Sequence, residues 1–341
     1  MIGAGSYEPN AAYWAAKKIT HPRFEYLGYI TTSGETARFA AAQLEDMKLF
    51  DWGGAYVYAT ITRDPGPGPY PAGSFEIDLY RCLRANLPLG PWEIVSDTSL
   101  AYTGSQGTIN DMWVAAGNII RMPDGSTRLY RYGAGTATSK CSMLVSIAPI
   151  GTAIEDLPSA LVPYAGNPIL VDPAGEWLND ALIWTPEDTG AGWRALYING
   201  VHGDGYYGVW ADSVDGLAWT IPTGAHALDI GADGEWDSKC VLPIGQKIYR
   251  NGRWEFPYQA ASGNRFSVGW AWTYDIETIH KDPDNPVLVA GVDGTVCREN
   301  PGVLVIDGKV HLFSVDANSW GGDLLSGGQG SYTKIHVSRE I

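Results

Sequence analysis

The chain has 341 residues, of which 45% are hydrophobic and 18% charged, a composition that supports a globular core. Its formal net charge of −15 repels phosphate backbones and anionic lipid, so nucleic acid and membrane surfaces are excluded as partners. No apolar run approaches the roughly 20 residues of a membrane-spanning helix. Neutral sugars suit such a charge better, as do divalent cations.

The first residues lack both the basic region and the apolar region of a secretory signal. Two routes stay open: a signal has been removed, or the protein is made in a cytoplasm and leaves by another route, such as a virion. We therefore expect an extracellular or virion-associated protein rather than a cytoplasmic one.

Residues 1–47 differ from the rest of the chain and are expected to form a short N-terminal α/β arm. Residues 11–18 and 35–47 have a helix-forming composition, and the second segment has an N-cap and an acidic first turn. Between them, residues 24–30 alternate like a strand. We predict that this arm docks the protein into an assembly.

After residue 47 the chain carries a repeat. Gly175-Glu-Trp177 recurs 59 residues later as Gly234-Glu-Trp236. Asn167-Pro-Ile-Leu170 recurs as Asn285-Pro-Val-Leu288 after 118 residues, which is two such periods. With 42 glycines, 14 tryptophans and 19 tyrosines, the composition indicates short strands joined by tight turns. Five periods fit the remaining length.

Hairpins recur within the periods. Residues 112–121 and 128–132 flank a Pro-Asp-Gly turn, and residues 302–306 and 309–314 flank Asp307-Gly308. Asp-Gly between alternating apolar runs is a strong hairpin signal. Four strands per period around a central channel predict an all-β fold, a five-bladed β-propeller over residues 48–341. A β-sandwich is the alternative, but it does not explain a fixed repeat.

Each period offers an acid where its innermost strand is expected to begin. These acids are Asp51, Asp111, Asp180, Asp237 and Glu299. Carboxylates around one axis repel each other, and burying them unpaired is costly. A function, a bound cation or a misaligned repeat must therefore explain them. Tryptophans that we expect to form a sugar-stacking platform are Trp113, Trp177, Trp236 and Trp320.

The segment from Arg298 to Ser314 resembles the one that carries the general acid in five-bladed propeller glycoside hydrolases. In the arabinanase, xylosidase and invertase families, a Glu followed by x-Pro opens an inner strand, and an Asp-Gly turn follows. Trp177-Leu-Asn-Asp180 is similar to the Trp-x-Asn-Asp of the invertase-like families. Residues 213–219 resemble an outer-strand motif of the same enzymes. The resemblance covers roughly residues 165–320.

Those families use three carboxylates from successive blades, in the order Asp, Asp, Glu. The resemblance implies that Asp180 is the base or nucleophile and that Glu299 is the general acid. It implies that Asp237 orients the substrate and tunes the pKa of the acid. The chemistry requires one carboxylic acid to protonate the leaving oxygen while an ionised partner acts across the sugar ring.

Each candidate also has a structural interpretation. Glu299 could be satisfied by Arg298 or by backbone N–H groups, and Asp237 and Asp111 could bond to turn N–H groups. The tryptophans could pack between blades. His202, which could reach a sugar or a metal, could equally be a solvated loop histidine.

Cation and cysteine sites are weakly indicated. Asp204 and the acidic loop 282–284 could ligate Ca²⁺, although no EF-hand-like spacing is present. The four cysteines, Cys82, Cys141, Cys240 and Cys297, have no zinc-site spacing and are predicted to be buried free thiols. A bridge between neighbouring strands, involving Cys240 or Cys297, stays open.

The sequence thus predicts a carbohydrate-active propeller, a glycoside hydrolase that uses axial carboxylates in general acid/base catalysis. The alternative is a non-catalytic glycan- or receptor-binding structural protein of a virion, such as a phage tail or head appendage. A third hypothesis is a structural propeller that uses its faces for protein contacts. The predicted substrate-binding residues are Asp111, Trp113, Trp177, His202, Trp236, Arg298 and Trp320.

Overall fold

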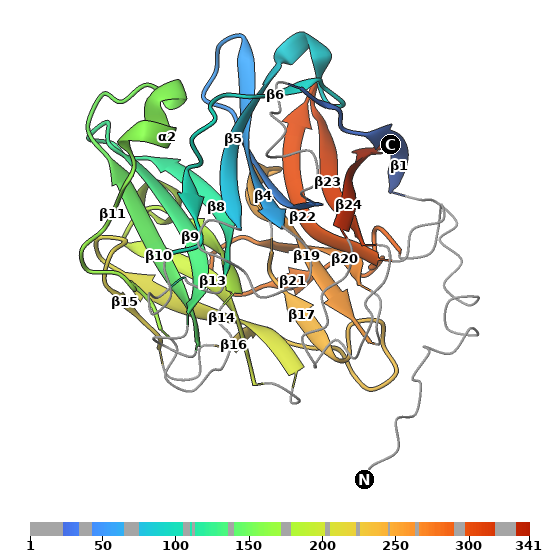
Figure 1. Cartoon of the computed structure of the whole chain (residues 1–341). Helices are drawn as coiled ribbons and strands as arrows, with labels where there is room; N and C mark the ends of the chain where they lie inside the picture. The colour runs from blue at the N-terminus through green and yellow to red at the C-terminus, as the bar shows by residue number, and fades with distance from the viewer. Residues whose placement is uncertain are drawn as a thin grey trace.

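The computed structural model describes residues 23–33, 43–64, 75–104, 110, 113–135, 140–171, 179–201, 205–222, 226–244, 246–262, 266–289, 297–317 and 332–341. Within these ranges the chain is built from strands, with four short helices (Figure 1). The helices are η1 (Arg84–Asn86), η2 (Ile154–Asp156), α2 (Leu157–Ala160) and α3 (Pro186–Thr189). None of them is long and apolar enough to span a membrane.

The strands pair into consecutive antiparallel groups along the chain. The first group contains β3 (Gln43–Phe50), β4 (Tyr56–Asp64), β5 (Glu76–Leu83) and β6 (Trp92–Ile94), with β2 (Thr32–Ser33) and β7 (Ala101–Tyr102) at its edge. The second contains β8 (Trp113–Arg121), β9 (Thr127–Gly135), β10 (Lys140–Ala148) and β11 (Val162–Pro163). The third contains β12 (Asn179–Trp184), β13 (Trp193–Val201) and β14 (Gly205–Ser213), edged by β15 (Trp219–Thr220) and β16 (His226–Leu228).

The fourth group contains β17 (Cys240–Leu242), β19 (Arg253–Ala261), β20 (Ser267–Thr273) and β21 (His280–Lys281), with β18 (Ile248–Arg250) beside β19. It is joined to the third group by a parallel bridge between Tyr206 and Cys240. The fifth contains β22 (Cys297–Ile306), β23 (Lys309–Ala317), β24 (Tyr332–Glu340) and β1 (Phe24–Tyr29). We interpret the five groups as propeller blades.

The hydrophobic core lies between successive blades and closes on itself. Cores join the first blade to the second, the second to the third, the third to the fourth, and the fourth to the fifth. A further cluster contains Met47 and Leu49 of the first blade together with Phe313 and Val337 of the fifth. Since burial of each large apolar side chain contributes about 1.5–3 kcal/mol, this last cluster holds the two ends of the blade series together.

The N-terminal residues take part in the sheets. β1 pairs with β24, the last strand of the chain, and Figure 1 shows the two side by side. The helix predicted over residues 35–47 is wrong for residues 43–47, which belong to β3. Burial of Met47 and Leu49 against the fifth blade overrides the local helix-forming composition. The predicted domain boundary at residue 47 therefore runs through a strand. Residues 1–22 and 34–42 lie outside the described residues, so the docking role stays a prediction.

The repeated Asn-Pro segments make the same contacts in two blades. The side chain of Asn167 accepts from Val145 N at 2.9 Å and donates to Val145 O at 2.8 Å. Asn285 makes the matching pair with the backbone of Trp270, at 2.7 and 2.9 Å. Each asparagine side chain thus pairs with the N–H of a strand residue and shares that residue's carbonyl with a backbone N–H of a later segment.

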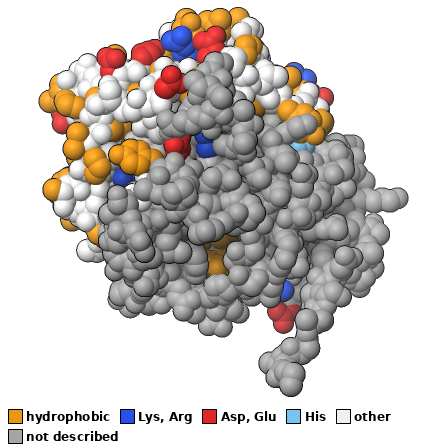
Figure 2. Space-filling view, viewed as in Figure 1, with side chains coloured by type: hydrophobic (Ala, Val, Ile, Leu, Met, Phe, Trp, Pro, Cys, Tyr) orange, Lys and Arg blue, Asp and Glu red, His pale blue; other side chains and the backbone are white. Residues whose placement is uncertain are grey.

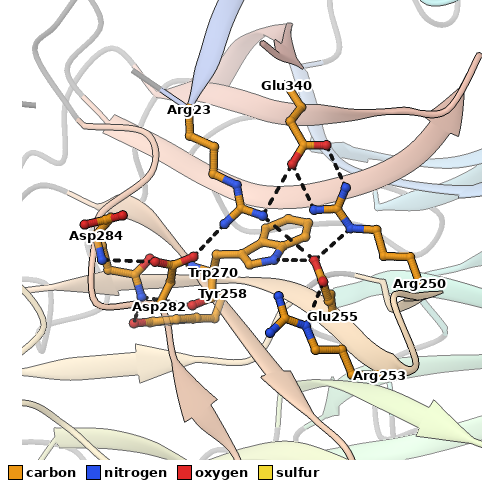
Figure 3. A network of polar contacts seen from close by, with 10 residues as sticks. Arg23, Arg250, Arg253, Glu255, Tyr258, Trp270, Asp282, Asp284 and Glu340 are labelled. Carbon is orange, nitrogen blue, oxygen red and sulfur yellow. Dashed lines mark hydrogen bonds and ion pairs between the residues drawn. The ribbon is translucent and has the colours of Figure 1, made fainter. Parts of the chain in front are cut away.

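A network of three arginines and three carboxylates ties Arg23, the residue that precedes β1, to the fourth blade (Figure 3). Glu255, whose side chain is 0% exposed, accepts from Arg250 and Arg253 at 2.8 Å each. Arg250 also binds Glu340 of β24 through two bonds, at 2.6 and 2.9 Å. Arg23 lies 2.6 Å from Asp282 and 3.4 Å from Glu340.

The charges of this network compensate each other. Burial alone would raise the pKa of Glu255, but hydrogen bonds from Arg253, Arg250 and Trp270 outweigh it and hold that pKa below its usual value. Because a buried carboxylate is stable only when paired and hydrogen-bonded, the network depends on all of its arginines. It links β24, the fourth blade and the residue that precedes β1.

Candidate functional site

Four of the innermost strands contain a register shift near their first residues. The shifts lie between Leu44 and Asp46 in β3, Ala115 and Asn118 in β8, Asn179 and Ala181 in β12, and Glu299 and Gly302 in β22. We call them the inner bulges. A bulge bends its strand and re-aims a side chain, and bulges are over-represented next to active sites. Their recurrence in four blades marks this level of the propeller as the candidate site.

A buried lysine lies between two buried aspartates at the inner bulges. Lys48 Nζ is 2.6 Å from Asp180 Oδ2 and 3.2 Å from Asp46 Oδ1. The three side chains are at most 5% exposed. Asn118 of the second blade donates from Nδ2 to Ala181 O at 3.2 Å and lies 3.4 Å from Asp180 Oδ1. Three blades therefore meet in one polar cluster.

The cluster holds one carboxylate more than its ammonium can neutralise. Burial raises the pKa of Asp180 to about 6, more than Lys48 lowers it, and Asp46 raises it further. Burial also raises the pKa of Asp46. Burial lowers the pKa of Lys48, but Asp180 and Asp46 together raise it above its usual value. Lys48 thus stays charged, while the ionisation of each acid disfavours that of the other.

The backbone at Asp180 is strained. Its φ is 28°, in a region that side-chain-bearing residues rarely adopt, and its own Oδ1 accepts from Ala181 N at 2.7 Å. Strain of this kind costs about 1–3 kcal/mol and clusters at functional sites. Asp180 therefore combines strain, burial and a shifted pKa, which is typical of a residue kept for its chemistry rather than for stability.

A cavity of about 320 Å³ borders this cluster. Lys48 and Asn118 form part of its wall, and the rest comes from residues where β3, β8 and β12 end and from the segment after β17. The polar cluster therefore adjoins a space large enough for a small ligand.

The structure gives two of the predicted acids other partners. Asp237 lies 2.6 Å from Lys281 of β21, the outermost strand of the fourth blade. Asp51 is bound by both terminal nitrogens of Arg84 at 2.7 Å, at the surface. It follows the end of β3 rather than its start, because β3 begins earlier than the repeat predicted. The acid at the inner bulge of the first blade is Asp46.

The other predicted residues are placed as follows. Trp236 is buried with its ring centroid 5.7 Å from that of Tyr258, which is a packing contact. Glu299 directly precedes the inner bulge of β22, which residues 300 and 301 form, whereas Asp180 itself forms the bulge of β12. Nothing is described of the Glu299 side chain. The same holds for the side chains of Arg298 in β22 and Trp113 in β8. The predicted residues outside the described ranges are Asp111, Trp177, His202 and Trp320.

Asp46, Lys48 and Asn118 were not predicted from the sequence. A signal was present in residues 46–49, where charged and apolar residues alternate. In a strand this alternation sends Asp46 and Lys48 to one face and Met47 and Leu49 to the other.

The structure also bears on the cysteines and on the acidic loop. Cys82 and Cys141 are buried free thiols and Cys240 is buried, whereas nothing is described of the Cys297 side chain. In loop 282–284, Asp282 binds Arg23 and accepts from Asp284 N at 3.0 Å. In the described part of the chain, no three His, Cys, Asp or Glu side chains are grouped for metal binding.

Known proteins share the fold but little of the sequence. No protein-family model matches the chain, and a search of curated proteins gives no match. A solved structure described as a glycoside hydrolase has a TM-score of 0.66 at 14% identity, over 99% of this chain and 96% of the other. A thermostable family-43 glycoside hydrolase has a TM-score of 0.63 at 13% identity, over 88% and 90%.

A β-1,2-mannobiose phosphorylase from Listeria innocua, in complex with β-1,2-mannobiose, has a TM-score of 0.60 at 13% identity. The match covers 94% of this chain and 92% of that one. The predicted all-β propeller is confirmed, and so is the distant resemblance to propeller glycoside hydrolases, at the level of the fold.

Proposed function

We propose that the protein acts on a carbohydrate at the inner bulges, as a glycoside hydrolase. The observation that carries the proposal is the buried Asp46–Lys48–Asp180 cluster, with the Asp180 pKa raised to about 6. A carboxyl group that titrates near the working pH is suited to proton transfer. Fold neighbours described as glycoside hydrolases, and one described as a mannobiose complex, support the substrate class.

In the proposed reaction, Glu299 donates its proton to the leaving glycosidic oxygen as the bond from that oxygen to the anomeric carbon breaks. Asp180 in its ionised form acts across the ring, either by taking a proton from an attacking water or by attacking the anomeric carbon itself. Asp46 keeps Lys48 in place, and Lys48 stabilises the ionised form of Asp180. We leave Asp237 out of the proposed site because Lys281 binds it.

Reducing-sugar release from a panel of polysaccharides tests this proposal. Glu299→Gln and Asp180→Asn are expected to lower turnover by 10²-fold or more, since each removes a proton-transfer group. Asp51→Asn is the matched control, because Asp51 is an acid at the end of the same strand as Asp46 but lies at the surface. Unchanged turnover in Glu299→Gln would exclude its role as the acid.

A second candidate function is non-catalytic glycan binding, for example in a virion. Lys48 bridges the two buried acids, which also suits a structural role for the pair. Glycan binding by the wild-type protein without release of reducing sugar from any member of the panel would favour this function.

A further inference from the structure

We propose that the cavity of about 320 Å³ is a second binding site, which takes a neutral mono- or disaccharide. It extends from Lys48 and Asn118 of the polar cluster to the ends of β3, β8 and β12 that lie away from the inner bulges. Phe50 and Arg121 are the last residues of β3 and β8, and Thr185 directly follows β12. The inner bulges lie near the first residues of the same three strands. One set of strands therefore carries a candidate site at each end.

The size of the cavity fits a small ligand. Ligand pockets in proteins usually enclose about 300–1,000 Å³, so this cavity is at the lower end of that range. Such a volume holds one or two sugar rings and no longer chain. The ligand is therefore expected to be a small molecule or the end of a chain.

One wall of the cavity is aromatic. The rings of Phe50 and Trp52 lie with their centroids 5.4 Å apart, and the Arg121 guanidinium carbon is 5.6 Å from the Trp52 centroid. Apolar faces combined with a few placed polar groups are typical of small-molecule sites. A sugar ring offers apolar C–H faces to such a wall and hydroxyl groups to the polar side chains.

Most of the charged groups around the cavity already have partners. Lys48 is held by the two acids of the polar cluster. Lys247 lies 2.8 Å from Asp188, and Asp188 also accepts from Thr185 N at 2.8 Å. These charges are therefore unavailable to neutralise a charged ligand.

The remaining charges are one cation and one anion. Arg121 and Glu187 both line the cavity, both are exposed, and neither forms an ion pair with another described residue. Their opposite charges cancel, so an anionic ligand would meet Glu187 and a cationic ligand would meet Arg121. Because like charges disfavour both, a neutral ligand with donors and acceptors fits best.

The test is a titration of the wild-type protein with single sugars, followed by calorimetry and by saturation-transfer NMR. The neutral probes are glucose, mannose, galactose, xylose and arabinose, and the charged probes are glucuronate and glucosamine. We expect at least one neutral sugar to bind more tightly than both charged ones. Tighter binding of glucuronate or glucosamine overturns the ligand class, and no binding by any probe overturns the site.

Variants locate the bound sugar. Trp52→Ala and Arg121→Ala are each expected to weaken binding about tenfold, which corresponds to about 1.4 kcal/mol. Arg121 is exposed, so its variant tests the site even if Trp52→Ala does not fold. Tyr249→Ala, an exposed aromatic change outside the cavity, is the matched control. Unchanged affinity in Arg121→Ala overturns the proposed location.

The outcome is separable from that of the proposed hydrolase. Glu299→Gln leaves the wall of the cavity intact and should bind the same sugar with unchanged affinity. Loss of this binding in Glu299→Gln would place the sugar at the inner bulges and overturn the second site. Loss of turnover in Glu299→Gln with unchanged sugar binding would support both the proposed catalytic role and the second site.

Discussion

Lys48 and Asp180 form an ion pair of 2.6 Å between β3 of the first blade and β12 of the third, which are not neighbouring blades. A buried charge pair therefore joins two blades that do not share an apolar interface as neighbours. Apolar contacts hold neighbouring blades together at their faces, as between Trp184 of β12 and Phe256 of β19. Buried ion pairs and apolar contacts thus both stabilise the propeller, and we expect them to respond differently to substitution and to pH.

Removing the lysine is expected to cost far more than removing either acid. Lys48→Met leaves two buried carboxylates without a counter-charge, which should lower the free energy of unfolding by about 3–5 kcal/mol. Asp180→Asn leaves Lys48 paired with Asp46, so a loss of less than about 1 kcal/mol is expected. Urea unfolding at pH 7 measures both. Equal losses in the two variants would contradict the sharing of one cation by two acids.

The stability of the protein should fall as pH rises through about 6. The pKa of Asp180 is raised from 3.8 to about 6 in the folded state, so the folded protein binds its proton more tightly than the unfolded chain does. This contribution is complete below pH 3.8 and is lost as pH rises through about 6. It amounts to about 3 kcal/mol at most, at 1.36 kcal/mol for each pH unit.

Asp180→Asn isolates this effect because asparagine does not titrate. The free energy of unfolding of the wild type, minus that of the variant, should decrease between pH 4 and pH 7. A difference that is constant over this interval would show that Asp180 is ionised throughout. The same protonation should abolish turnover as pH falls through about 6, if Asp180 acts in its ionised form.

Local chemistry decides which features could be predicted from the sequence. Asn167 and Asn285 recur because each bonds to the backbone of a strand in its own blade, 22 and 15 residues away. Asp307 and Gly308 adopt positive φ values of 50° and 77° in their turn. Such signals are contained in short segments, so the repeat and the hairpins could be predicted. The strands of the sheets follow from the same patterns.

Contacts between segments that are distant in the chain could not be predicted from the sequence. Lys48 and Asp180 are far apart in the chain, and nothing near Lys48 indicates its partner. Residues 35–47 have a helix-forming composition, but part of this segment is a strand because Met47 is buried against the fifth blade. The pairing of β1 with β24 likewise depends on the ring of blades and not on either strand alone.

Breaking the arginine network should loosen the closure of the propeller. Glu255→Gln removes the buried charge that Arg250 and Arg253 bind, so the free energy of unfolding should fall by about 3–5 kcal/mol. Arg339→Ala is the control, because its pair with Glu25 is 40% and 44% exposed and should contribute at most about 1 kcal/mol. Thermal unfolding measures the loss of stability in both variants. Equal losses would contradict the idea that burial strengthens the Glu255 ion pairs.

Exposed ion pairs should respond to salt, unlike the buried pairs of Glu255. Acidic and basic side chains lie side by side among the described atoms of the face in Figure 2, rather than in separate patches. Surface pairs of this kind are screened by salt. Raising the salt concentration should therefore change the stability of Arg339→Ala relative to the wild type, and leave the effect of Glu255→Gln nearly unchanged.

At Gly302, β22 of the fifth blade packs tightly against β3 of the first blade. A Cβ atom there would collide with the backbone oxygen of Met47 in β3 and come within 2.8 Å of Leu49 Cδ1. Backbone cannot move aside as a flexible side chain can, so Gly302→Ala should force β22 away from β3. Overpacking of this kind costs about 1–3 kcal/mol, and denaturant unfolding should show a loss of that size.

Val305→Ala, at a position 43% exposed in the same strand, should change stability by less than about 0.5 kcal/mol. If Gly302→Ala were as stable as the wild type, β22 would not pack tightly against β3 at this position. The first and fifth blades would then have to be held together by β1 and the arginine network alone.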